Sequence, residues 1–462
     1  MENKSDTAPA QGKVISNGMT KVVTRIAPSP TGYLHFGLAR TALFSYLFAR
    51  KTGGEFILRI EDTDAARNKP EYEEDITEEL AWLTLNADRR FRQSDHRARH
   101  TECLRELIKK GLAYESDEPA KDDSSKMVRV VRLRNSGEEV VFNDIIRGEI
   151  RFDTTELGDF VIARSIDDPL YHLAVVIDDE DEGLTHIIRG EDHISNTPRH
   201  ILLQRALGFK TPLYAHIPLI LMADKSKMSK RRHESSVKHY RELGILPEAV
   251  INYLALLGWN PGGDREFYTL DELVDIFDLS RVQKGGAVFD EVKLLSVNQH
   301  WMRTLSVDDF ITRGNLEAPD AEILRKTVPL LKERAHTFAE AREMLSGELS
   351  CLFSAPALDR TRLVAKELPE RPGMTKTTLE SLCEAVKSLP EGVSAEAVKE
   401  AVMPFADAEE AKGKGGRGAV LWPLRYALSG ADRSPDPFTL ISVLGPSESL
   451  SRIHKAIAIL EE

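Results

Sequence analysis

Two short segments, far apart in the sequence, carry residues that could bind a triphosphate. His35-Phe36-Gly37 stands where a loop enters a predicted helix, so backbone N–H groups and a ring N–H could meet phosphate oxygens. Lys227 and Lys230, on a polar loop, could neutralise a departing pyrophosphate. With 13 histidines and 29 glycines, H-x-G alone is expected about once by chance. Both segments together, in this order, point to adenylyl transfer.

A second group of residues suits a small amino acid that carries two carboxylates. Arg25 falls in the first predicted strand and Arg189 at the end of a later one, and arginine binds carboxylate through a two-pronged fork. Glu61 ends another strand and could take an ammonium group, while Tyr171 and Ser29 offer hydroxyls. For each arginine alone, an internal ion pair with the acids at 178–182 or 191–192 is slightly favoured over substrate binding. Beside the adenylylation elements, substrate binding is favoured.

The elements that must position these residues follow from hydrophobic runs and glycine or proline breaks. A strand, a helix and a second strand in succession form a βαβ unit, which predicts a parallel sheet with its ligand at the carboxyl ends of the strands. The first such unit is expected at 22–27, 37–50 and 56–60, with helices following at 70–85 and 97–112. A second α/β portion is expected at 185–189, 197–207 and 216–222.

The stretch between the two α/β portions has a different pattern. Residues 115–126 are polar and predict a loop, and from 128 to 176 the pattern favours strands and turns. An insertion of this kind would form a separate lobe. Beyond about residue 240 the chain is expected to be mainly helical to its end. The fold class is therefore α/β, with an inserted lobe and all-α modules after it.

Composition excludes several classes of protein. With 462 residues, several domains are expected. No run of eighteen apolar residues predicts a membrane span, and the polar first twenty residues lack a secretory signal. The three cysteines are too far apart for a zinc knuckle or a disulfide framework, which fits a reducing cytoplasm. The net charge of −12 weakly disfavours nucleic-acid binding. The basic segment 225–241 keeps it open, although it could equally be a solvated loop.

At these residues the sequence resembles a bacterial-type glutamyl-tRNA synthetase, of the class I aminoacyl-tRNA synthetase family. RIAPSPTGYLHFG is similar to the opening segment of the family, and His35–Leu38 fall at its signature named HIGH. The resemblance is strong from about 21 to 303 and weaker towards the end. It is also carried by LRIEDTD (58–64) and by segments at 187–209, 215–231, 246–261, 281–294 and 418–430.

The resemblance implies a role for each candidate residue. Arg25, Ser29, Glu61, Tyr171 and Arg189 would hold glutamate. His35, Gly37 and Lys230 would bind ATP, with His35, Lys227 and Lys230 serving catalysis. ATP would arrive with Mg²⁺. The expected partner is tRNA(Glu), with tRNA(Gln) open as a second acceptor, and the enzyme is expected to be a monomer.

The resemblance also implies a division into domains. The catalytic domain would be of the class I Rossmann type, and the lobe inserted into it would bind the acceptor stem. After a flexible tail at 1–20, the expected order is a first catalytic half at 21–95, the acceptor-binding lobe at 96–184, a second catalytic half with the KMSKR loop at 185–240, a helical stem-contact domain at 241–310 and a helical anticodon-binding domain at 311–462.

Three positions depart from the family pattern. Leu38 stands where the family usually has a small residue, which affects contacts to ATP. His172 follows Tyr171 where many relatives carry asparagine. The loop at 115–127 is shorter than usual and lacks the cysteine-containing zinc segment of some members, so we predict no structural zinc and no protein-held metal.

Three other functions remain as alternatives. An enzyme that glutamylates a modified tRNA base would lack an anticodon-binding region, and the long sequence after Thr304 argues against it. A small-molecule nucleotidylyltransferase would need neither that length nor the paired arginines. A non-catalytic tRNA-binding paralogue would be expected to have lost His35 or the lysines of KMSKR, and all are present.

Overall fold

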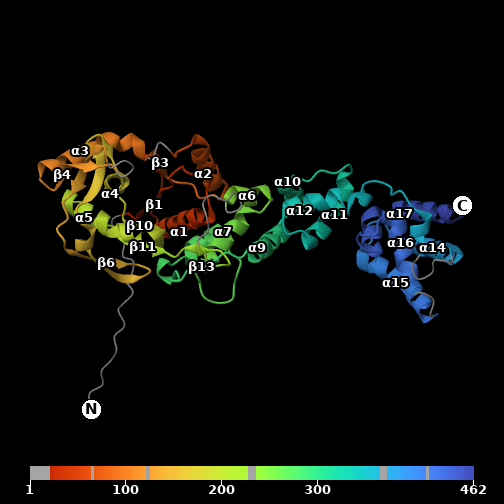
Figure 1. Cartoon of the computed structure of the whole chain (residues 1–462). Coiled ribbons are helices and arrows are strands. Elements are labelled where there is room, and N and C mark those ends of the chain that lie inside the picture. Colours follow the sequence, from red (N-terminus) through yellow and green to blue (C-terminus); the bar gives the residue numbers. More distant parts are fainter. Residues whose placement is uncertain are drawn as a thin grey trace, which may run out of the picture. The chain divides into compact units, whose positions relative to one another are not determined.

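The computed structural model describes residues 21–63, 67–120, 125–226, 236–364, 372–412 and 416–461. Its contacts divide the chain into two compact units (Figure 1). The first consists of the residues before Tyr240 together with Val250–Asp290. The second consists of Tyr240–Ala249 and the residues from Glu291 onward. The candidate site lies in the first unit.

A parallel sheet forms the centre of the first unit. Strands β1 (Val23–Ile26), β2 (Glu55–Ile60) and β3 (Arg89–Arg92) pair in parallel, linked by helices α1 (Phe36–Lys51) and α2 (Pro70–Trp82). Strands β10 (His186–Gly190) and β11 (Leu213–Ile217) form a second parallel pair, linked by α5 (Thr197–Leu207). Thr185 joins the pairs, since its amide donates to the carbonyl of Val23 at 3.1 Å and its hydroxyl accepts from Val23 N–H at 2.9 Å. The spatial order is β3-β2-β1-β10-β11.

The predicted α/β fold is confirmed, and the physical reason is visible in the strands. Every residue of β1 is buried, as are all but the first of β2, which is the pattern of strands covered on both faces. Helix α1 begins at its N-cap residue His35. It ends before Gly53, whose positive φ of 63° lets the chain turn into β2.

The inserted segment is built from two antiparallel pieces. Its elements are α3 (Arg97–Lys109), β4 (Ala113–Pro119), β5 (Met127–Leu133), β6 (Glu139–Asp144), β7 (Gly148–Asp153), β8 (Phe160–Ser165), β9 (Asp168–Pro169) and α4 (Tyr171–Asp181). Strands β4, β5, β8 and β9 form one sheet. The β6–β7 hairpin instead joins the central sheet, where Asp144 pairs with Tyr214 of β11.

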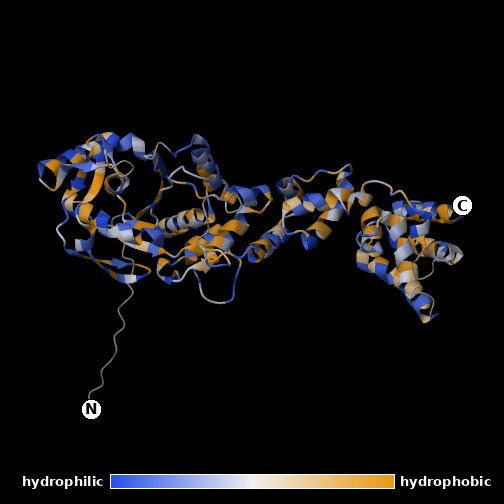
Figure 2. Cartoon of the chain, in the orientation of Figure 1, coloured by the Kyte–Doolittle hydropathy of each residue, from blue (hydrophilic) through white to orange (hydrophobic). Residues whose placement is uncertain are grey.

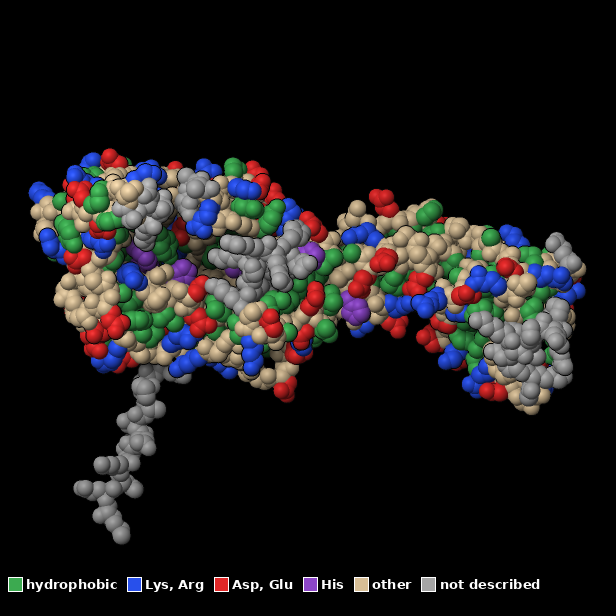
Figure 3. All heavy atoms as spheres, viewed as in Figure 1, with side chains coloured by type: hydrophobic (Ala, Val, Ile, Leu, Met, Phe, Trp, Pro, Cys, Tyr) green, Lys and Arg blue, Asp and Glu red, His purple; other side chains and the backbone are tan. Residues whose placement is uncertain are grey.

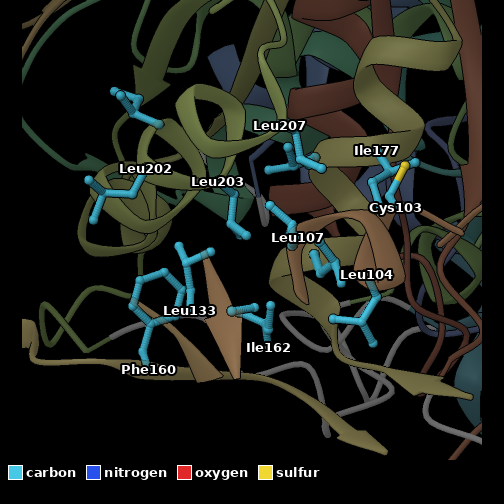
Figure 4. Close-up of a cluster of buried hydrophobic side chains, with 14 of the residues drawn as sticks. Cys103, Leu104, Leu107, Leu133, Phe160, Ile162, Ile177, Leu202, Leu203 and Leu207 are labelled. Atoms are coloured by element: carbon cyan, nitrogen blue, oxygen red, sulfur yellow. The ribbon is translucent and has the colours of Figure 1, made fainter. Parts of the chain in front are cut away.

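A hydrophobic cluster packs the strands of this segment against its own helices α3 and α4 and against α5, which links β10 to β11 (Figure 4). Leu133, Phe160 and Ile162 face side chains of α3, α4 and α5. Their close packing buries apolar surface from both portions of the chain in one core, which fixes the inserted strands against α4 and α5.

The prediction of a loop at 115–126 was wrong over its first part. Residues Ala113–Pro119 form β4, paired antiparallel with β5. Polar side chains of β4 point outward, and opposite charges face each other across the strands, as in the ion pair of Asp117 with Arg129 at 2.9 Å. Such a strand lacks the apolar alternation that marks a half-buried strand in sequence. Residues 121–124 lie outside the described residues.

The remainder of the chain is mainly helical, as predicted. Hydrophobic and hydrophilic residues alternate along the helices of the second unit, the pattern of amphipathic helices packed on one another (Figure 2). Within the described residues, no helix is long and apolar enough to cross a membrane. The elements are β12 (Ile220–Leu221), α6 (Val237–Glu242), α7 (Pro247–Leu256), α8 (Leu270–Ile276), β13 (Ala287–Val288), α9 (Glu291–Thr304), α10 (Val307–Gly314), α11 (Ala321–Arg334), α12 (Phe338–Ser346), α13 (Arg360–Leu363), α14 (Pro372–Lys387), α15 (Ala395–Ala411), α16 (Gly418–Ser429) and α17 (Pro437–Glu461).

Candidate active site

A pocket opens at the carboxyl ends of the central strands, the position where open parallel sheets bind ligands. Six of the residues singled out in the sequence line it: Arg25, His35, Gly37, Glu61, Tyr171 and Arg189. Ser29 lines an adjacent pocket that shares Glu61 and Tyr171. Histidine side chains gather in a hollow of the first unit (Figure 3). Lys227 and Lys230 lie outside the described residues.

One side of the pocket holds a buried network of opposite charges. The carboxylate of Asp179, on α4, accepts from Arg25 Nε at 3.2 Å and from Arg59 Nη1 at 2.5 Å. Arg59, which is fully buried, also donates from Nη2 to Glu61 Oε1 at 3.1 Å. The ion-pair interpretation of Arg25 therefore holds in part, because Asp179 belongs to the acidic segment 178–182.

The pKa values of the two acids in this network move in opposite directions. Burial would raise the pKa of Asp179, but Arg25 and Arg59 outweigh it and lower that pKa below its usual value. For Glu61 burial dominates and raises the pKa, although Arg59 and Arg25 oppose it. Glu61 is thus an acceptor held in a dry site, where a ligand cation would favour its charged form.

The other side of the pocket holds Arg189 among neutral groups. Its Nε donates to His216 Nε2 at 3.1 Å, Nη1 to His200 Nδ1 at 3.2 Å and Nη2 to Thr197 Oγ1 at 2.8 Å. Within the described residues Arg189 forms no ion pair, and it is only 5% exposed. Burial lowers its pKa. An arginine buried without a directly bonded carboxylate is costly to the folded protein and is prepared for an anionic ligand.

Tyr171 stands between the two sides of the pocket. Its hydroxyl lies 3.4 Å from His193 Nδ1. Burial raises its pKa to about 12, and the nearby Glu61 acts in the same direction. The phenol therefore keeps its proton at neutral pH and can donate a hydrogen bond to a ligand oxygen.

The end of the pocket that His35 and Gly37 line is built at the start of α1. His35 is the N-cap, and its Nδ1 accepts from Leu38 N–H at 3.3 Å, so the neutral ring carries its proton on Nε2. A side chain at Gly37 would come within 3.1 Å of the His35 ring, which explains the glycine. Leu38 contributes its backbone N–H to the cap and its side chain to the pocket wall.

Two residues of the site, Arg59 and Arg40, were missed by the sequence analysis, and Asp179 was named only within the acids at 178–182 that could pair with an arginine. Arg40 is buried in the pocket lining near His35 and Gly37, and it donates to the carbonyls of Leu257, at 2.8 Å, and Pro218. Burial lowers its pKa to about 10. The acidic segment at 178–182 was a usable signal for Asp179. Arg40 has none, since it looks like any charged residue of a surface helix.

Metal-binding groups were sought separately. Among the described residues, no three or more His, Cys, Asp or Glu side chains are grouped so that they could hold a metal ion. The three cysteines, Cys103, Cys351 and Cys383, are buried and free.

Comparisons with known proteins identify the family of the chain. Residues 21–122 and 118–296 match the family described as tRNA synthetases class I (E and Q), catalytic domain. Residues 296–457 match an anticodon binding domain. A glutamate–tRNA ligase from Carboxydothermus hydrogenoformans is 37% identical over 497 residues, covering 94% of this chain and 99% of the relative. Glutamate–tRNA ligase 1 from Syntrophus aciditrophicus is 37% identical over 477 residues, covering 96% and 98%.

Solved structures give the same result. A glutamate tRNA ligase from Elizabethkingia meningosepticum, in complex with its amino acid, has a TM-score of 0.80 and 33% identity, covering 95% of this chain and 99% of that one. A glutamate-tRNA synthetase from Elizabethkingia anophelis has a TM-score of 0.76 and 33% identity, covering 95% and 100%. Family matches over most of the chain, near full-length relatives and a common fold agree. The chain therefore belongs to the glutamate–tRNA ligase family of class I aminoacyl-tRNA synthetases.

Proposed function

We propose that the chain joins L-glutamate to tRNA(Glu), using ATP and passing through glutamyl-adenylate. The observation that carries this proposal is Arg189, buried among uncharged partners in the same pocket as Arg25 and Glu61. A ligand that brings carboxylates and an ammonium group supplies the charges this pocket lacks. The relatives named as glutamate–tRNA ligases support the same substrate.

In this proposal each site residue has one task. Arg25 and Arg189 bind carboxylate, Glu61 accepts from the ammonium group, and Tyr171 and Ser29 provide hydroxyls. His35 and Gly37 take the triphosphate at the start of α1, where Nε2–H of His35 can donate to a phosphate oxygen. Lys227 and Lys230 would neutralise the leaving pyrophosphate, and Mg²⁺ would come bound to ATP.

The reaction would need no protein base in its first step. A carboxylate oxygen of glutamate, already an anion, attacks the α-phosphorus of ATP, and the bond to pyrophosphate breaks. In the second step a ribose hydroxyl at the 3′ end of tRNA attacks the activated carbonyl, and AMP leaves. The protein contributes position and charge, so catalysis rests on orientation and on fixed donors.

The same proposal assigns the rest of the chain. The lobe at 96–184 would receive the acceptor end of tRNA, and the helices after residue 310 would read the anticodon. Residues 296–457, which match an anticodon binding domain, support the second assignment. We further propose that the enzyme acts in the cytoplasm and is a monomer. Light scattering of the purified protein would test the monomeric state.

The direct test is ATP-dependent transfer of labelled glutamate onto separate tRNA(Glu) and tRNA(Gln) transcripts. Glutamine and aspartate serve as control amino acids. Charging of tRNA(Glu) supports the proposal, and charging of both transcripts would widen it to a second acceptor. If neither transcript is charged while the protein is folded, the proposal is wrong.

The role of Lys230 can be tested by itself. Lys230→Ala should lower adenylate formation by roughly 10²–10³, the usual effect of losing one preorganised donor to a developing charge. Rapid-quench measurement of adenylate gives the rate. A decrease below about fivefold would remove Lys230 from the mechanism without affecting the assignment of glutamate.

A further inference from the structure

A buried chain of hydrogen bonds leads from Arg189 to the inserted hairpin. Arg189 Nε donates to His216 Nε2 at 3.1 Å, and His216 Nδ1 lies 2.7 Å from Asp144 Oδ2. Asp144 ends strand β6, and His216 belongs to β11. Both side chains are almost completely buried. Neither residue was singled out in the sequence.

The direction of each bond in this chain is fixed by chemistry. Arginine can only donate, so His216 must accept on Nε2, and the proton of the neutral ring must sit on Nδ1. The carboxylate of Asp144 accepts that proton's hydrogen bond. Burial lowers the pKa of His216, although Asp144 opposes it, so the ring stays neutral at physiological pH. Asp144 thereby selects the tautomer that can hold Arg189.

Asp144 is itself held rigidly. Its Oδ1 accepts from the backbone N–H of Ile146 at 3.0 Å and of Arg147 at 2.9 Å. Its Oδ2 accepts from His216 N–H at 3.0 Å as well as from the ring. Four donors therefore fix the carboxylate, and the turn after β6 has no freedom to release His216.

The same turn also reaches the nucleotide end of the pocket. Arg147 pairs with Glu191 Oε2 at 2.5 Å and donates to the carbonyl of His216 at 3.2 Å. Glu191 Oε1 accepts from the backbone N–H of Leu219 at 2.8 Å, and Leu219 lines the pocket. One hairpin turn thus braces both ends of the site.

We propose that Asp144 and His216 are positioning residues for glutamate recognition, which orient the Arg189 guanidinium through the Asp144–His216–Arg189 chain. This inference rests on the proposed function, because it assumes that Arg189 binds a carboxylate of glutamate. The competing explanation is that the two residues only stabilise the junction between hairpin and sheet.

Two substitutions of His216 separate these explanations. In His216→Gln the amide oxygen replaces Nε2 and can still accept from Arg189, while the donor to Asp144 is lost. In His216→Asn the amide N–H replaces Nδ1 and can still donate to Asp144, while nothing accepts from Arg189. Positioning predicts that glutamate KM stays within about threefold in His216→Gln and rises at least about tenfold in His216→Asn. The melting temperature should decrease more in His216→Gln, which loses the donor to Asp144, than in His216→Asn, which keeps it.

A third variant tests the tautomer. In Asp144→Asn one of the two carboxylate oxygens becomes an amide N–H group. That group must face either the turn amides or His216, and both of these are donors to the wild-type carboxylate. His216 would then turn its Nε2–H towards Arg189, where two donors oppose each other. Glutamate KM should rise at least about tenfold, with ATP KM within twofold. Asp153→Asn is the matched control, since Asp153 lies exposed on the same hairpin and bonds only to Thr155 among the described residues.

The experiment is steady-state charging of tRNA(Glu) with glutamate and ATP varied in turn, alongside thermal unfolding of each variant. The expected result is a selective rise of glutamate KM in His216→Asn and Asp144→Asn but not in His216→Gln or Asp153→Asn. The positioning role is wrong if His216→Asn, Asp144→Asn and His216→Gln all keep the wild-type glutamate KM. It is also wrong if glutamate KM rises in all three variants in proportion to the decrease in their melting temperature. If the wild-type protein charges no tRNA with glutamate, the proposed function fails instead.

Discussion

The two sides of the pocket surround buried arginines with different partners, acidic on one side and uncharged on the other. On the side of β1 and β2, Arg25 and Arg59 share the carboxylate of Asp179, and Arg59 also pairs with Glu61. On the side of β10 and β11, Arg189 is as deeply buried but bonds to two histidines and a threonine. A buried cation with acidic partners has part of its charge balanced by the fold, whereas one with neutral partners depends on a ligand for that balance.

This comparison predicts its largest effect on activity at Arg189. Arg189→Met removes the charge that would hold a glutamate carboxylate while keeping most of the side-chain volume. We expect kcat/KM for glutamate to fall by about 10³, the usual scale for truncating one partner of a buried charge pair. Charging assays at varied glutamate measure this. A change of less than tenfold would mean that Arg189 is not a substrate-binding residue.

The matched change on the other side should act on stability. Arg59→Met leaves the carboxylates of Asp179 and Glu61 short of a buried partner, and the free energy of unfolding should fall by about 3–5 kcal/mol. Arg189→Met should change it by no more than about 1 kcal/mol, because the cost of burying an unpaired charge disappears with the lost hydrogen bonds. Urea unfolding of both variants gives the comparison. Equal losses would erase the difference between the two sides.

A smaller effect is expected at the acid that joins the network to the ligand. Glu61→Gln keeps an oxygen for Arg59 but removes the charge that would face an ammonium group. We expect glutamate KM to rise about 10- to 100-fold, the value of one charge-assisted hydrogen bond. The KM for ATP is the internal control. Glutamate KM within threefold of wild type would place the ammonium group elsewhere.

The smallest expected effect is on the pH dependence of stability, and it tests whether the histidines beside Arg189 stay neutral. His200 accepts from Arg189 and contacts His172 at 3.1 Å, and burial, reinforced by Arg199 and Arg189, lowers the pKa of His172 to about 4. Between that value and an unfolded pKa of about 6.5, the unfolded chain binds more protons. The contribution of His172 to the free energy of unfolding is therefore fully present above about pH 6.5 and is lost as the pH decreases towards 4.

Replacing His172 should flatten this pH dependence. In His172→Asn the loss of unfolding free energy between pH 7 and pH 5 should be smaller by about 1 kcal/mol, a value reduced for the partial exposure of the ring. Thermal unfolding across this pH range measures it. The exposed His454 provides the control variant His454→Asn. An unchanged slope in His172→Asn would mean that folding does not lower the pKa of His172.

The sequence alone was enough to predict the local elements and the meeting of the candidate residues. Helix 197–207 and the first βαβ unit were marked by apolar runs and by glycine breaks, which act locally. Because parallel strands end at one edge, Arg25, Glu61 and Arg189 could be expected in one pocket. The structure brings them together there, and their roles remain proposals.

Partners that depend on long-range packing could not be predicted in the same way. Arg59 of β2 meets Asp179 of α4, and Asp144 of the inserted hairpin reaches His216 of β11. A charge in the sequence gives no sign of whether it will be buried or which charge it will meet. Strand β4 was not predicted for a related reason. Its stability comes from cross-strand pairs rather than from an apolar face.

The central claim is that Arg189, which forms no ion pair among the described residues, binds a carboxylate of glutamate. Calorimetric titration of glutamate into wild-type protein and Arg189→Met, each shown to be folded by its thermal transition, tests this most directly. We predict saturable binding to the wild type and a dissociation constant at least about 10²-fold weaker in the variant. Equal affinity of the two proteins for glutamate would contradict the account.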